Sequence, residues 1–165
     1  MKTSLLPLVQ KSLEVAGIAY KVVECDPELA DTAAFCERYG FSLDQSANTI
    51  IVQAKTEPRS YAACVVLAST RLDVNQTVRA LMATKKVSFA PMDEALRLTG
   101  MDYGGVTIFG LPMDIPIYID AGVLAPNEVI LGGGNRFSKV LLAPAELLKL
   151  PGVQVVDGLA KQAIT

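Results

Sequence analysis

Two apolar runs in the middle of the chain, separated by a short polar segment, constrain the fold more than any other feature of the sequence. Residues 48–54 and 61–68 are mostly apolar, and the six residues between them read Lys-Thr-Glu-Pro-Arg-Ser. Two strand-like runs with such a connection predict a β-hairpin whose loop is longer than the tightest type.

The remaining segments predict helices towards both ends of the chain and strands in its middle. Helical spacing, caps and stop signals predict helices over residues 5–16, 32–39, 74–82, 92–99 and 144–150. Apolar and β-branched runs predict further strands over residues 18–23, 86–89, 115–119, 129–131, 138–142 and 153–156. This order favours a mixed α/β fold, with a curved, barrel-like mixed β-sheet core flanked by helices. With 165 residues and no linker or internal repeat, we expect one domain over residues 1–165.

The absence of histidine restricts the chemistry of this chain. Without histidine, neither a Ser-His-Asp triad nor a Cys-His pair is available. The three cysteines, at positions 25, 36 and 64, form no C-x-x-C pair, so we expect no metal site and no cofactor. Any hydrolysis must then use carboxylates, lysine, tyrosine, hydroxyls, backbone amides or groups of the substrate itself.

Charge and hydropathy restrict the partners. The formal net charge is −2 and the pI is about 5.2, which argues against broad phosphate contact but leaves room for one nucleotide end. No apolar run reaches the roughly 18–20 residues of a membrane span, and polar residues interrupt the N-terminal apolar segment. We therefore expect a cytoplasmic protein with no membrane partner.

Three groups of motifs, in this order and spacing, resemble the YbaK/EbsC family, the editing domain associated with prolyl-tRNA synthetase. The first group comprises residues 32–35, 39–40 and 46–52. The second comprises residues 87–91 and 98–100, followed by the glycine-containing stretch 103–112. The third comprises residues 117–120, 130–134 and 142–147. The resemblance extends from about Thr32 to Leu148, and the glycine-containing stretch is its most specific part.

This resemblance implies an aminoacyl-tRNA deacylase that acts in trans on mischarged tRNA. Its partner would be the 3′ aminoacyl end of tRNA, and a synthetase or a second copy of the chain remains open as a further partner. In the family, backbone N–H groups of a glycine-containing loop meet the substrate carbonyl, and a lysine at the start of the first core strand holds the terminal nucleotide. A ribose hydroxyl of the substrate assists the attacking water. Backbone donors need no titrating side chain, which suits a chain without histidine.

Two positions depart from the family pattern. Asn48 occupies the position of the usual lysine, as in a distinct branch of the family, and Ile108 that of the usual loop proline. Asn48 retains hydrogen-bonding groups but carries no cation, and Ile108 lacks the fixed φ of proline. The alternative function is therefore a catalytically weakened binding module of the same fold, for an aminoacyl or nucleotide ligand or a protein partner.

The candidate site residues follow from these motifs. The candidates for catalysis are Asn48, Gly104, Gly105, Thr107, Ile108 and Gly110. The candidates for substrate binding are Thr32, Thr99, Asp120, Gly132, Gly133, Gly134 and Lys139. Ordinary structural roles remain open for several of them: a strand edge for Asn48, turns for the glycines, a cap for Asp120 and a solvated surface position for Lys139.

Overall fold

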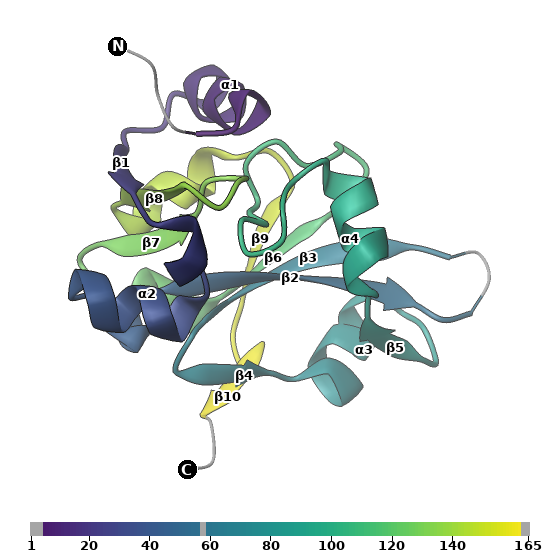
Figure 1. The fold of residues 1–165 in the computed structure, drawn as a ribbon. Helices are drawn as coiled ribbons and strands as arrows, with labels where there is room; N and C mark the ends of the chain where they lie inside the picture. The colour runs from purple at the N-terminus through teal and green to yellow at the C-terminus, as the bar shows by residue number, and fades with distance from the viewer. Residues whose placement is uncertain (1–4, 57–58, 163–165) are drawn as a thin grey trace.

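A five-stranded mixed sheet forms the centre of the protein in the computed structural model, which describes residues 5–56 and 59–162 (Figure 1). Its strand order is β5 (Val87–Phe89), β2 (Ala47–Ala54), β3 (Tyr61–Leu67), β6 (Ile117–Asp120) and β9 (Val153–Val156). The β2–β3 hairpin is antiparallel, as predicted, and β5 is antiparallel to β2. The pairs β3–β6 and β6–β9 are parallel.

Two smaller sheets accompany the central one. The first has the order β1 (Lys21–Glu24), β8 (Ser138–Leu142) and β7 (Val129–Gly132). The second joins β10 (Ala160–Gln162) to β4 (Thr70–Leu72). The mixed α/β class is thus confirmed. The described part of the chain shows no closed or curled sheet, so the barrel-like core is not confirmed.

The central sheet is covered on both faces, because successive strand residues point to opposite sides. Ile51 and Val65 belong to the larger apolar cluster, together with residues of the N-terminal helix. Val52 and Cys64 belong to a second cluster on the other face. The long apolar character of the hairpin therefore reflects burial of both faces.

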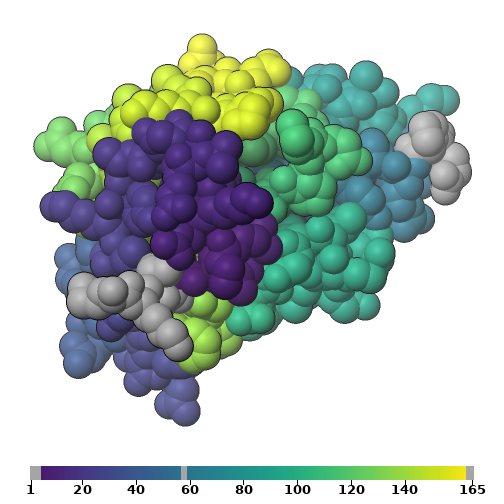
Figure 2. All heavy atoms as spheres, turned by 90° about the horizontal axis from the view of Figure 1, so that it is seen from above, coloured from purple at the N-terminus to yellow at the C-terminus, as the bar shows by residue number. Residues whose placement is uncertain are grey.

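The helices surround these sheets (Figure 1). The α-helices are α1 (Pro7–Ala16), α2 (Thr32–Tyr39), α3 (Arg79–Leu81) and α4 (Met92–Thr99). The 3₁₀ turns are η1 (Pro27–Leu29), η2 (Leu43–Gln45), η4 (Ala121–Leu124) and η5 (Pro144–Lys149), and η3 (Val74–Val78) is a π-helical turn. Seen from above, α1 lies on the surface well apart from the hairpin end of β2 and β3 (Figure 2). No described helix has the length and apolarity needed to cross a membrane.

Some predicted elements differ from the observed ones. The helix predicted over residues 144–150 is the 3₁₀ turn η5. It ends at Lys149, because Pro151 restricts Leu150 to extended backbone. The helix predicted over residues 74–82 divides into η3 and the short α3. The strands β4 and β10 were not predicted, because each has three residues and its partner lies about ninety positions away.

Candidate functional site

A gap in the strand pairing of β2 lies beside a cavity that several segments of the chain line. On its outer side, β2 pairs with β5 only over residues 52–54, and an isolated bridge joins Ser46 to Ile130 of β7. Within the described chain, no strand pairs with that edge over residues 47–50. A cavity of about 410 Å³ lies here, within the size range of small-ligand sites.

Five segments of the chain contribute to the cavity wall. They are the start of α2 with the two residues before it, the first half of β2, the β5–α4 junction, the glycine-containing loop after α4, and the β7–β8 pair. Five candidate residues from the sequence line it: Thr32, Asn48, Gly104, Gly132 and Lys139. Residues from distant parts of the sequence thus meet in one cavity, as the motif resemblance implied.

Asn48 is oriented by the first residue of α2. The Thr32 hydroxyl donates to Asn48 Oδ1 at 2.7 Å. Thr32 stands where it does because α2 begins directly after Asp31, whose backbone is extended. Within the described residues, the Asn48 NH₂ group has no protein partner. Because its oxygen is engaged, Asn48 offers N–H donors to a ligand in the cavity.

Lys139 brings a cation into the same cavity. It is 8% exposed and lies on β8, the middle strand of the three-stranded sheet. Its Nζ donates to the Ala30 carbonyl at 2.9 Å and lies 5.0 Å from the centre of the Phe35 ring. Burial lowers the pKa of the ammonium below its usual value of 10.5, and the Asp31 carboxylate acts in the opposite direction. The cavity therefore contains a lysine, although position 48 does not supply it.

The glycine-containing loop presents only some of its amides to the cavity. The Gly105 N–H donates to the Asp102 carbonyl at 2.9 Å, and the Thr107 N–H approaches Met101 Sδ at 3.3 Å. Gly104 and Val106 line the cavity, and neither amide has a partner within residues 5–56 and 59–162. Together with that of Tyr103, which also lines the cavity, these N–H groups are free backbone donors of the loop in the described part of the chain.

The two glycine loops, residues 104–110 and 132–134, lie against each other. The Gly134 N–H donates to the Gly105 carbonyl at 2.8 Å. A side chain at Gly132 would come within 2.7 Å of the same carbonyl oxygen, and one at Gly105 within 2.4 Å of the Asn135 carbonyl. Glycine is required at these positions because the two backbones pass too closely for a Cβ atom.

Arg136 holds the first glycine loop in place. Its Nη1 donates to the Tyr103 carbonyl at 2.9 Å, its Nη2 donates to the Pro27 carbonyl, and its guanidinium lies 5.6 Å from the Tyr103 ring centre. Gly104, the next residue, adopts φ +81°, a left-handed conformation that favours glycine. Since its donors are engaged by carbonyls, Arg136 positions the loop that carries Gly104.

The other candidates from the sequence do not line the cavity: Thr99, Gly105, Thr107, Ile108, Gly110, Asp120, Gly133 and Gly134. Ile108 is 1% exposed and its side chain packs within the main core. Thr99 donates to the Ala95 carbonyl at 2.8 Å at the end of α4. Asp120 caps η4 and accepts from the Ala160 N–H at 3.1 Å. A contribution of these residues to the site remains a prediction.

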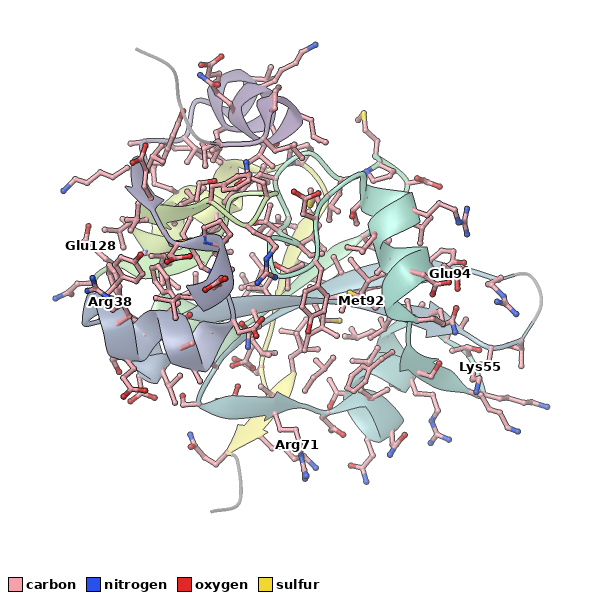
Figure 3. All side chains as sticks on the ribbon, viewed as in Figure 1. Arg38, Lys55, Arg71, Met92, Glu94 and Glu128 are labelled. Atoms are coloured by element: carbon pink, nitrogen blue, oxygen red, sulfur yellow. The ribbon has the colours of Figure 1, made fainter. Side chains whose placement is uncertain are left out.

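Other lining residues were not among the sequence candidates. Phe89 and Met92 come from the β5–α4 junction, Tyr103 and Val106 from the loop, and Asp31 from the start of α2. Figure 3 shows Met92 on the inner side of α4, whereas Glu94 points towards the hairpin end. Phe89 and Tyr103 lie within the family-like stretches, but an aromatic residue beside a motif is equally typical of a core position.

The cysteines do not form part of this cavity. Cys25, Cys36 and Cys64 are free and buried, and none lines the cavity. Burial raises the pKa of the Cys64 thiol to about 12, and burial also raises the pKa of Cys25. Within residues 5–56 and 59–162, no group of three or more Cys, Asp or Glu side chains is arranged to hold a metal ion.

Comparison with known proteins identifies the family. The model of the aminoacyl-tRNA editing domain matches residues 26–150, more than half of the 165-residue chain. The chain belongs to the aminoacyl-tRNA editing domain family. The matched segment of this editing domain contains every wall of the cavity.

Individual relatives agree with this assignment. The uncharacterized protein YwhH of Bacillus subtilis strain 168 is 28% identical over 126 residues, which cover 76% of this chain and 78% of YwhH. A crystal structure of a candidate trans-editing enzyme for prolyl-tRNA synthetase is 27% identical, with a TM-score of 0.81, and the match covers 97% of this chain and 100% of the other. The hypothetical protein APE2540, 24% identical with a TM-score of 0.83 over 93% of this chain and 99% of its own, shares the fold.

Proposed function

We propose that this editing domain hydrolyses, in trans, the ester bond of a mischarged aminoacyl-tRNA, and that the reaction takes place in the 410 Å³ cavity. One observation carries the proposal. Asn48, the Gly104 loop and the buried Lys139 contribute donors to a single cavity in a chain of the editing family. The placement of a lysine there offsets the missing cation at position 48.

The cavity offers donors suited to a developing oxyanion. As water adds to the ester carbonyl carbon, the carbonyl oxygen gains negative charge, and the Gly104 and Val106 amides stabilise it. When the carbon–oxygen bond breaks, the ribose oxygen takes a proton, and the products are the free amino acid and deacylated tRNA. Fixed donors of this kind stabilise a transition state without reorganising.

Lys139 and Asn48 hold the substrate in this scheme. The Asn48 NH₂ group donates to a polar atom of the terminal nucleotide or of the amino acid. The Lys139 ammonium supplies a charged hydrogen bond, which is roughly twice as strong as a neutral one. As the resemblance to the family implies, a ribose hydroxyl of the substrate assists the attacking water. The ionisable residues of the cavity lining are Asp31, Tyr103 and Lys139.

Single-turnover deacylation with a panel of mischarged tRNAs tests the proposal. We expect the wild-type protein to release the amino acid from at least one of them, and the rate to fall when Lys139 is replaced. If the wild type binds the charged tRNAs but hydrolyses none, the binding-module alternative replaces the deacylase. Lys149→Met is a suitable control, because Lys149 lies on the surface in an ion pair with Glu146.

A further inference from the structure

The edge of the central sheet beside the cavity combines an exposed aromatic ring with exposed lysines. Phe89 ends the edge strand β5, lines the cavity, and is 57% exposed. Tyr103 lines the same cavity and is 51% exposed. Two large aromatic side chains thus remain open to solvent at the cavity, where burial inside the protein does not explain them.

Positive charges gather at the other end of β5. Lys85 and Lys86 directly precede this strand, and Lys55 is their neighbour across the sheet, since the Lys55 N–H donates to the Lys86 carbonyl at 2.9 Å. Arg79 lines a shallow surface hollow together with Lys85. We call these four residues, Lys55, Arg79, Lys85 and Lys86, the β5 basic edge.

The cations of the β5 basic edge are available for an external partner. All four side chains are exposed, and none forms an ion pair with any residue in the described ranges 5–56 and 59–162. On α4, the carboxylate of Glu94 is engaged with Arg97 and with the Tyr61 hydroxyl. Figure 3 shows Lys55 extending outward from the hairpin end of the sheet.

The geometry points to the path of the RNA single strand, an inference that rests on the proposed function. We infer that a base of the single-stranded 3′ end stacks on Phe89 and that the preceding phosphates follow β5 to the β5 basic edge. Lys86 precedes Phe89 by three residues, about 10 Å along a strand. Aromatic rings combined with a basic track are typical of single-strand binding that ignores sequence.

This local arrangement explains how an acidic protein can hold RNA. The chain has a net charge of −2, so the electrostatic field of the whole protein does not attract a polyanion such as RNA. The charges at the β5 basic edge act within about one Debye length of the strand, where local cations outweigh the overall charge. Binding should therefore be confined to a short segment next to the cavity.

Binding of an uncharged RNA oligonucleotide that ends in CCA, followed by fluorescence anisotropy across a salt series, tests the charge component. The test variant is Lys85→Glu/Lys86→Glu, and the control is Lys11→Glu/Lys21→Glu, which makes the same change in net charge on α1 and β1. We expect the test variant to bind about tenfold more weakly and its salt slope to fall by about 1.4, the value for two lost contacts with a single strand. The control should retain the wild-type affinity and slope.

A second matched pair tests stacking. Phe89→Ala should weaken binding about fivefold or more, with the salt slope unchanged. Phe137→Ala removes a ring that is 52% exposed but lies outside the cavity, and it should bind like the wild type. Thermal unfolding of every variant shows whether each is folded.

The outcomes separate this inference from the proposed function. Equal weakening by the two charge variants, or no RNA binding by the wild type, would overturn the inference. Deacylation that is insensitive to Lys85→Glu/Lys86→Glu at subsaturating tRNA would also overturn it, while the deacylase proposal would stand. RNA binding with the expected pattern but without any deacylation would support the inference and refute the deacylase.

Discussion

Replacing Lys139 by methionine separates the function of this buried cation from its structural contribution. The ammonium makes one charged hydrogen bond, to Ala30 at 2.9 Å, and its pKa is lowered chiefly by burial. If it also donates to the substrate in the transition state, its loss removes a charged hydrogen bond worth about 1.5–3 kcal/mol. We therefore expect kcat/KM for deacylation to fall roughly 10- to 150-fold.

The stability of the same variant should change in the other direction. Because the pKa of Lys139 is lowered on folding, the unfolded chain holds this proton more tightly than the folded one. The charged lysine thus reduces the free energy of unfolding at every pH below its folded-state pKa, and this cost disappears as the pH rises through that pKa towards 10.5. Lys139→Met removes the cost, so we expect the Tm at neutral pH to be unchanged or higher.

Two measurements decide the matter: single-turnover deacylation, and thermal unfolding as a function of pH. An unchanged kcat/KM would refute the role of Lys139 in the site, and a Tm several degrees lower would show that the residue is mainly structural. The double variant Asn48→Lys/Lys139→Met returns a cation to the cavity from β2. It should recover part of the lost activity if the charge itself, rather than the position of Lys139, is what the reaction needs.

Three further predictions follow from the cavity and its loops. Gly104→Val places a branched side chain at φ +81° and should displace the free loop amide, which raises the deacylation barrier by about 3 kcal/mol. Asn48→Ala should raise the same barrier by only about 1 kcal/mol. A slower single-turnover rate for Asn48→Ala than for Gly104→Val would contradict the backbone-donor mechanism. Deacylation should survive EDTA and thiol alkylation, since the cysteines, including Cys64 with a pKa of about 12, lie outside the cavity; activity that disappears after dialysis against EDTA and returns with zinc would show otherwise. Gly105→Ala should lower the free energy of unfolding by about 1–3 kcal/mol, because its Cβ would lie 2.4 Å from the Asn135 carbonyl, and a denaturant midpoint equal to that of the wild type would disprove this contact.

The elements predicted best from the sequence are those whose ends carry a local signal. α2 and α4 end at Gly40 and Gly100, both in the left-handed conformation, and these stops are readable from residue type alone. The β2–β3 hairpin was equally clear, because its two apolar runs are long and close in sequence. The pairing of β4 with β10 carries no such signal, since it depends on contacts between distant segments.

Some features of the candidate site could be predicted from the sequence, and others could not. The motifs indicated Asn48, Thr32 and Gly104, and the structure places all three in one cavity. The burial of Lys139 was not predictable, because it arises when Ala30 and Phe35 pack over β8 from more than a hundred positions away. Which amides of the loop are free was also not predictable, because it depends on the hydrogen bonds that the folded chain forms with the other loop amides.

The gap in the pairing of β2 also bears on whether another chain can add a strand to this sheet. An unpaired strand edge is a template on which another chain can add a strand, the first step of many aggregates. Here the open stretch, residues 47–50, is short and lies between β5 on one side and the Ser46–Ile130 bridge on the other. An incoming strand would have to enter the cavity past Phe89 and Tyr103. The fold thus keeps backbone groups accessible to a small ligand while denying them to an extended polypeptide.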